Sequence, residues 1–209
     1  MYPWQQSQLN LLHQAFVRDR LSHAYLLSGV SGLGKTDFAR EFSMFLLCIN
    51  QVHEGNTIAC GNCRSCKQFQ GNTHPDFLLI EPEEKSKTIK IDQIRTLTET
   101  ISKTAHAGGY QMAIISPVDA LSVAAANALL KTLEEPSGKV IIFLIDNQLH
   151  VLPATIVSRC QKIIFNGDDQ KCLPWLKEKY PAEKNLALLL KISGDAPLAI
   201  SHYMNNHFL

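Results

Sequence analysis

Between two apolar segments the chain reads Gly29-Val30-Ser31-Gly32-Leu33-Gly34-Lys35-Thr36, which follows the phosphate-loop pattern G-x-x-x-x-G-K-T. The apolar residues 24–27 precede this stretch, and Phe38, Phe42 and Phe45 follow it at helical spacing. The sequence therefore predicts a buried strand, a glycine-rich turn and a helix in direct succession. Such an order suits an anion, because backbone N–H groups and a helix N-terminus would surround it.

The loop itself predicts a nucleotide site that extends from Gly29 to Thr36. We expect Lys35 to reach the β- and γ-phosphates of ATP or ADP, and the Thr36 hydroxyl to hold Mg²⁺. The alternative is a chance turn of Gly, Lys and Thr, which the flanking strand and helix disfavour. The three phenylalanines are expected in the core rather than on a base-stacking surface.

Composition limits the classes of protein to which the chain can belong. Of its 209 residues 45% are hydrophobic and 19% charged, which is enough to bury a core in one or two domains. With a net charge of only +1, the chain as a whole has no positive electrostatic potential that would attract nucleic acid or an anionic membrane. The N-terminus lacks the pattern of a signal peptide, and no apolar run has the length of a membrane span. We therefore expect a cytoplasmic protein with no membrane partner.

Four of the six cysteines follow the pattern C-x11-C-x2-C-x2-C, and they are Cys48, Cys60, Cys63 and Cys66. The two overlapping Cys-x-x-Cys pairs bring three thiolates together, and Cys48 at the end of the loop helix completes a tetrahedral set. This predicts structural zinc, because disulfides are disfavoured in a reducing cytosol. His53 is an alternative to Cys48 as the first ligand. Cys160 and Cys172 are expected to be plain core or surface thiols.

The remaining patterns alternate as in an α/β protein with a parallel sheet. Further strands are predicted at 77–80, 112–115, 140–145 and 162–165. Helices are predicted at 91–101, at 124–134 after a Ser122 cap, and at 154–159. Beyond 167 only helical patterns appear, at 173–180, 183–192 and 196–204. We expect a nucleotide-binding α/β domain over 1–166, with a zinc module at about 48–66, and a small helical lid over 167–209.

Two motifs in the second half of the chain carry a resemblance to a known family. The segment 127–136, NALLKTLEEP, followed by Ser158-Arg159-Cys160, resembles the clamp-loader branch of the AAA+ ATPases. The cysteine cluster after the loop helix, Trp4 with Gln5, and the segments 23–27 and 71–76 are also similar to bacterial clamp loaders. The resemblance extends over essentially the whole chain. It implies an AAA+ domain and lid in the machine that opens a ring-shaped sliding clamp and closes it around primed DNA.

The resemblance also implies partners and a compartment. The chain would assemble with other clamp-loader subunits, gamma/tau and delta, in the cytoplasm. It would meet the sliding clamp and primed DNA through that complex. As part of the polymerase III holoenzyme it would belong to a DNA-directed DNA polymerase. Family members carry a further helical collar domain, and nothing up to Leu209 matches it.

Departures from the family's motor pattern predict a subunit with negligible ATP hydrolysis. In hydrolysing members the strand equivalent to 112–115 runs into Asp-Glu, whereas here it runs into Ser116 and Pro117, with Asp119 beyond them. Neither Ser nor Pro can act as a carboxylate base. Pro197 occupies the position that the resemblance assigns to the lid arginine. The chain is therefore expected to act as a stator.

In contrast to these departures, the chain retains Arg159 of the family's Ser-Arg-Cys motif. The resemblance implies that it acts as an arginine finger on the nucleotide of a neighbouring subunit. The alternative is a surface arginine that caps its helix through the dipole.

Two other functions remain open from the sequence, namely an active ATP-hydrolysing motor of the gamma/tau kind and a non-replicative zinc-binding adaptor. Two local features have ordinary interpretations: Lys131 is expected to pair with Glu134 and Glu135 on a solvated helix face, and His74 to lie in a turn.

Overall fold

The computed structural model describes residues 1–51, 58–83, 86–106, 109–135, 138–147 and 152–207. A five-stranded, fully parallel sheet forms its centre, with the strands in the order β2-β3-β4-β1-β5. The strands are β1 (Ala24–Ser28), β2 (Phe77–Ile80), β3 (Gln111–Ile115), β4 (Val140–Asp146) and β5 (Gln161–Ile164). β1, β3 and β4 are buried over their whole lengths, which explains their continuous apolar sequences.

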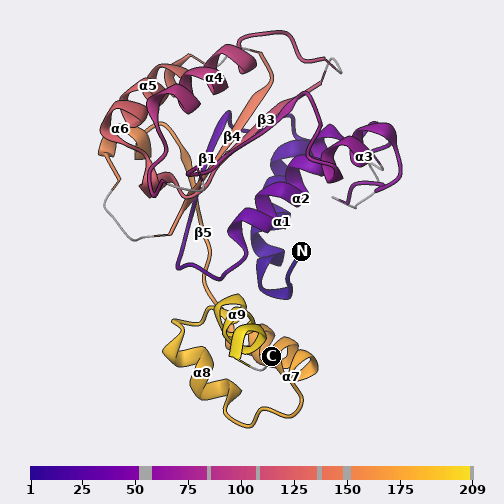
Figure 1. Ribbon diagram of the computed structural model, residues 1–209. Helices are drawn as coiled ribbons and strands as arrows, with labels where there is room; N and C mark the ends of the chain where they lie inside the picture. The colour runs from indigo at the N-terminus through magenta and orange to yellow at the C-terminus, as the bar shows by residue number, and fades with distance from the viewer. Residues whose placement is uncertain (52–57, 84–85, 107–108, 136–137, 148–151, 208–209) are drawn as a thin grey trace.

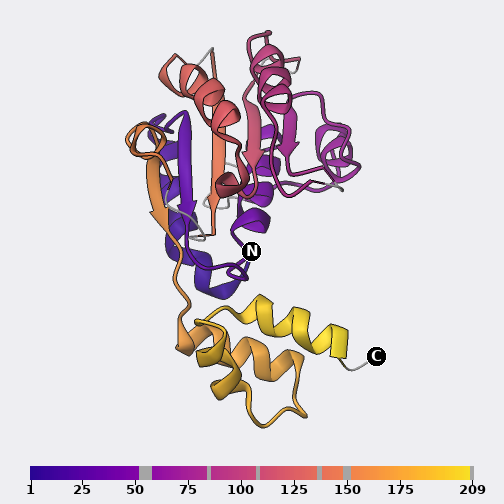
Figure 2. The same cartoon turned by 60° about the vertical axis from the view of Figure 1, so that its left-hand side comes forward.

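Helices cover both faces of the sheet (Figures 1 and 2). One face carries α1 (Gln6–Val17), α2 (Lys35–Leu47) and α3 (Arg64–Gln70). The other carries α4 (Ile91–Ile101), α5 (Val123–Glu134) and α6 (Ala154–Val157). Phe38, Phe42 and Phe45 of α2 are fully buried against the first face. The phosphate-loop helix is thus fixed to the sheet by the apolar stripe that the sequence predicts.

After β5 the chain forms three helices, α7 (Asp169–Lys179), α8 (Leu186–Ile192) and α9 (Pro197–His207). They lie beyond the carboxyl ends of the strands (Figures 1 and 2). Their apolar residues form a separate cluster that also includes Trp4 of the short 3-10 helix η1 (Pro3–Gln5). A second 3-10 helix, η2 (Val118–Ala120), follows β3. That the two parts, 1–166 and 167–209, are separate domains stays a prediction.

The α/β class and the parallel sheet are confirmed, as is each predicted strand. Ser122 caps α5, since its hydroxyl accepts from the N–H of Ala125 at 3.2 Å. Two helices, α1 and α3, were not expected from the sequence. Within the described ranges, no helix has the length and hydropathy needed to cross a membrane.

Candidate functional site

The phosphate-loop pattern lies between the carboxyl end of β1 and the first turn of α2. Two of its glycines have conformations that other residues rarely adopt, with φ of 87° at Gly32 and 75° at Gly34. A Cβ atom at Gly34 would lie 2.6 Å from the ring of Tyr2, and one at Gly32 would lie 2.8 Å from the backbone nitrogen of Ala199. Both positions therefore require glycine because of backbone geometry and close neighbours.

The backbone of this loop offers donors to an anion. Among the residues that the structure describes, no protein group accepts a hydrogen bond from the N–H of Gly32, Leu33 or Gly34. These groups precede a helix of 13 residues, whose N-terminus carries partial positive charge. The arrangement fits a phosphate group.

Lys35 is buried in the loop, with 3% of its surface exposed. Its ammonium donates to the carbonyl oxygens of Gly29, at 2.7 Å, and Val30, at 2.8 Å. Burial lowers the pKa of Lys35 to about 8, against the opposing effect of the Asp146 and Asp119 carboxylates. A phosphate would have to draw the ammonium away from these two carbonyls.

The end of β3 meets the loop at Thr36, whose hydroxyl oxygen lies 3.2 Å from that of Ser116. Ser116 thus places a hydroxyl rather than a carboxylate beside the residue expected to hold Mg²⁺, and the next residue, Pro117, also has no carboxylate. Asp146 lies on the neighbouring strand and accepts from the Ser28 hydroxyl at 2.6 Å. Asp119, in η2, has a buried Oδ1 with no hydrogen-bond partner among the described residues.

The N-terminal residues 2–5 lie against the loop, a contact that sequence reasoning missed. The indole of Trp4 donates to the carbonyl of Leu33 at 3.0 Å. The amide of Gln5, which is fully buried, donates to the carbonyls of Leu33 and Gly34, both at 2.9 Å. These bonds fix the second half of the loop from the side of α1.

An aromatic cluster joins this N-terminal segment to the C-terminal helices. Tyr2 stacks on Trp4 with ring centroids 4.9 Å apart, and Trp175 of α7 meets Trp4 edge-on at 5.3 Å. Burial and the carboxylate of Asp37, which accepts from the Tyr2 hydroxyl, raise the pKa of Tyr2 to about 12. Nearby, the N–H of Leu198 donates to the carbonyl of Gly32 at 3.0 Å. The phosphate loop is thus contacted from both ends of the chain.

Arg159 follows α6 and is held by groups of its own chain. Its Nη2 lies 2.5 Å from Oε1 of Glu134, and its Nη1 donates to the carbonyl of Thr155 at 2.8 Å. The expected pairing of Glu134 with Lys131 is wrong, because α5 and α6 pack so that Glu134 faces Arg159 instead. The arginine side chain remains one-third exposed.

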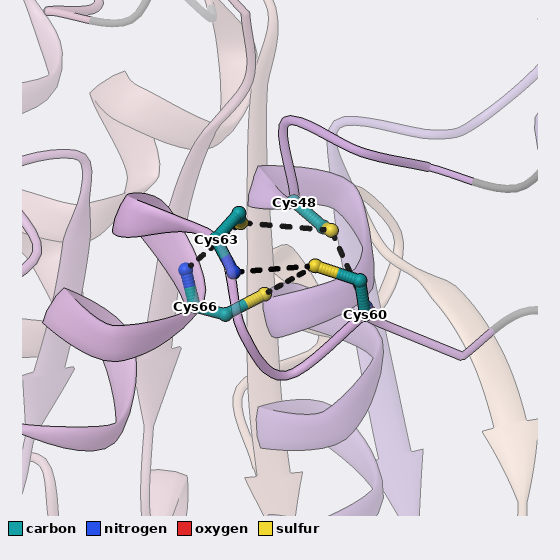
Figure 3. A group of neighbouring side chains, drawn as sticks. All are labelled: Cys48, Cys60, Cys63 and Cys66. Carbon is teal, nitrogen blue, oxygen red and sulfur yellow. Dashed lines mark hydrogen bonds between the residues drawn. The ribbon is translucent and has the colours of Figure 1, made fainter.

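The four cysteines of the predicted cluster come together between the end of α2 and the start of α3 (Figure 3). Their sulfur atoms all lie within 4.8 Å of one another. The Sγ atoms of Cys48 and Cys63 are 3.9 Å apart, as are those of Cys60 and Cys66. Four sulfurs at tetrahedral positions around zinc, each at about 2.3 Å, would be about 3.8 Å apart. These residues could therefore hold a metal ion.

Backbone N–H groups point at several of these sulfurs, as suits thiolate ligands. The N–H groups of Cys60, Cys63 and Cys66 each lie 3.4 Å from the sulfur of another cysteine of the set. Burial acts against the Cys63 thiolate, but donors from Cys66 and Ile49 outweigh it and lower the pKa of Cys63 to about 6. Burial raises the pKa values of Cys48 and Cys66.

The predictions for the remaining cysteines and for two histidines have different outcomes. His53, the alternative first ligand, lies outside the described residues. Cys172 is buried and Cys160 partly buried, both away from the cluster, as expected of plain thiols. The interpretation of His74 as a turn residue was incomplete, because the side chain is buried and bonded to Ser65.

Comparison with known proteins shows the family to which this chain belongs. Residues 4–169 match the family described as DNA polymerase III, delta subunit. Over 95% of the chain it is 42% identical to the DNA polymerase III subunit delta' of Pseudomonas aeruginosa, of which it covers 60%. It is 33% identical, over 94% of its length, to the subunit of the same name from Escherichia coli, of which it covers 58%. The chain thus spans about three fifths of the length of these curated relatives.

Among solved structures, the fold resembles that of a DNA polymerase III gamma subunit-related protein from Thermotoga maritima. The TM-score is 0.60 at 21% identity, and the match covers 95% of this chain and 62% of the other. This likeness concerns the fold alone.

Proposed function

The chain belongs to the DNA polymerase III delta subunit family, and we propose that it is a clamp-loader subunit that acts as a stator. In this role it holds nucleotide without turning it over and supplies Arg159 to a neighbouring ATPase site. Its partners would be the gamma/tau and delta subunits, and through them the sliding clamp and primed DNA. The observation that carries the proposal is the contact of Thr36 with Ser116, where a hydrolysing subunit needs a carboxylate.

Nucleotide binding is supported by the loop geometry. ATP or ADP with Mg²⁺ would be held by Gly29 to Thr36, with phosphate oxygens replacing the two carbonyls that Lys35 now contacts. The unpaired N–H groups of Gly32 to Gly34 would donate to the same phosphates. Mg²⁺ would neutralise phosphate charge beside the Thr36 hydroxyl.

Negligible turnover is supported by what surrounds Thr36. Hydrolysis needs a base that orients water, and loss of a positioned base costs about 10²–10⁴-fold in rate. Neither the Ser116 hydroxyl nor the Pro117 ring can serve as that base. Pro197 begins α9 and brings no cation to the γ-phosphate from the lid. Binding and hydrolysis are therefore separable in this chain.

The finger role of Arg159 is supported by its position rather than by its present partner. It follows the short helix α6, its side chain is one-third exposed, and it is bonded to a carboxylate that is itself half-exposed. A phosphate of a neighbouring subunit could replace Glu134 as its partner, because guanidinium binds carboxylate and phosphate with the same fork of donors.

The four cysteines would hold structural zinc. In the reducing cytoplasm, where we place the chain, thiols stay available to a metal rather than forming disulfides. The four sulfurs would take all four tetrahedral positions and leave none for water, so the metal would fix the chain between α2 and α3 rather than catalyse a reaction.

One observation favours the alternative of an active motor of the gamma/tau kind. Asp119 has a buried, unpaired carboxylate oxygen, and its charge acts on Lys35. If this carboxylate served as the base, the isolated chain would hydrolyse ATP and Asp119→Asn would abolish the activity. A non-replicative zinc adaptor is the second alternative, and only co-purification with clamp-loader subunits excludes it.

The test combines these two experiments. Tagged full-length subunit should co-purify with gamma/tau and delta, and the subunit alone should show no steady-state hydrolysis above the Lys35→Ala background. Hydrolysis that depends on Lys35 and Asp119 would establish the motor, and failure to co-purify would favour the adaptor.

A further inference from the structure

A chain of buried hydrogen bonds connects the cysteine cluster to the sheet through His74 and Ser65. His74 Nδ1 lies 3.1 Å from the backbone nitrogen of Asp76, and His74 Nε2 lies 2.8 Å from the Ser65 hydroxyl. That hydroxyl lies 2.5 Å from the carbonyl oxygen of Leu47. His74 and Ser65 are 5% and 4% exposed, so water cannot replace these bonds freely.

The partners fix where each proton lies. The backbone N–H of Asp76 can only donate, so Nδ1 of His74 must accept and carries no proton. The imidazole is then neutral with its proton on Nε2, which donates to Ser65, and Ser65 gives its own proton to Leu47. Burial lowers the pKa of His74, against the nearby Asp76 carboxylate, in keeping with a neutral ring.

One end of this chain of hydrogen bonds lies next to the cysteines. Leu47 directly precedes Cys48, and Ser65 lies between Cys63 and Cys66. The end of α2 and the first turn of α3, which flank the cysteine cluster, are therefore joined at Ser65. The other end is anchored at Asp76, whose carbonyl accepts from Met112 of β3 at 2.9 Å.

We infer that His74 and Ser65 are positioning residues for the four-cysteine metal site. They hold Cys48 at the distance from Cys63 and Cys66 that one metal requires, and they touch neither the metal nor its ligand sulfurs. This inference rests on the proposed metal. The turn before β2 does not itself require a buried histidine, and the positioning role explains why His74 is buried and bonded to Ser65.

The test measures zinc release to EDTA from the full chain and from variants with single substitutions. Ser65→Ala and His74→Ala break the chain of bonds and should release zinc about 10- to 100-fold faster. Loss of residues that support metal ligands typically changes metal affinity by that factor. Gln can place its amide N–H near the position of Nε2, so His74→Gln should restore slow release. Asn reaches only the position of Nδ1, so His74→Asn should not.

A matched control is His23→Gln, because the ring of His23 also contacts a backbone carbonyl, that of Leu133 at 2.9 Å, away from the cysteines. It should release zinc at the wild-type rate. The Co²⁺-loaded proteins give a second readout: the thiolate-to-cobalt absorption should be altered in His74→Asn and Ser65→Ala and normal in His74→Gln.

The outcomes separate the two proposals. Metal bound by the wild type and released at the same rate from all His74 and Ser65 variants would overturn the positioning role alone. A wild type that binds no zinc or Co²⁺ would overturn the metal proposal and this inference with it. Equal loss in His74→Gln and His74→Asn would show a packing effect rather than a hydrogen-bond chain.

Discussion

Arg159 forms an ion pair with Glu134 across 2.5 Å, linking the end of the NALLKTLEEP segment to the Ser-Arg-Cys motif. The two motifs that carry the family resemblance are thus in direct contact within one chain. The pair is partly exposed, which makes it weak enough to exchange for another anion.

The strength of this pair can be measured with a double-mutant cycle. Glu134→Gln, Arg159→Gln and the double variant should give a coupling free energy of about 0.2–1 kcal/mol in urea unfolding, because water screens the pair. Added salt should reduce it further. A coupling well above 2 kcal/mol would contradict the view that Arg159 is free to change partners.

Affinity for Mg²⁺-ATP should depend on the ionisation of Lys35. Burial lowers its pKa to about 8, so the ammonium form that attracts phosphate is lost as pH rises through that value. Titration calorimetry should therefore show constant affinity between about pH 7 and 7.5 and up to a tenfold decline per unit well above pH 8. Lys35→Ala should bind weakly at every pH. Equal affinity at pH 7.5 and 9.5 would contradict a role for the Lys35 ammonium.

Nucleotide binding should change tryptophan fluorescence. The chain has two tryptophans, Trp4 and Trp175, and both lie in the cluster with Tyr2, which covers Gly34. Saturating Mg²⁺-ATP should alter the emission of the wild type and leave that of Lys35→Ala unchanged. An unaltered spectrum at a concentration that calorimetry shows to be saturating would mean that the N-terminal cover stays in place.

The zinc site should carry one metal ion per chain. Cys63→Ser removes one of the four sulfurs, so elemental analysis should show metal lost while Mg²⁺-ATP binding persists, because the cluster and the phosphate loop lie at opposite ends of α2. Cys160→Ser is the control and should keep its metal. Loss of zinc from both variants alike, or from neither, would contradict the four-cysteine assignment.

Sequence patterns predicted the features that depend on neighbours along the chain. β4 is a continuous apolar run because both its faces are buried. The phosphate loop and the cysteine cluster could be recognised because each depends on the spacing of residues that are close in the sequence. α1 was missed because Leu12 is its only buried residue, so its sequence shows a narrow apolar stripe.

The contacts that sequence could not supply join distant segments. Glu134 meets Arg159 only because α5 packs on α6, and Trp4 meets Leu33 only because the N-terminus folds over the loop. His74 precedes a proline, which suits a turn, and nothing in that local pattern reveals Ser65 as its partner. Such side chains gain their roles from tertiary packing.

The central claim is that this subunit supplies Arg159 to a neighbouring ATPase site and does not hydrolyse ATP itself. The most direct test measures the rate of ATP hydrolysis by the assembled clamp loader, with sliding clamp and primed DNA present, when only this subunit is mutated. Removing an arginine finger costs about 10³–10⁵-fold at the affected site in GTPases. The account predicts that Arg159→Ala strongly lowers hydrolysis in a complex that still assembles, whereas Lys35→Ala lowers it far less. The reverse result, with hydrolysis dependent on Lys35 and indifferent to Arg159, would contradict it and identify this subunit as a motor.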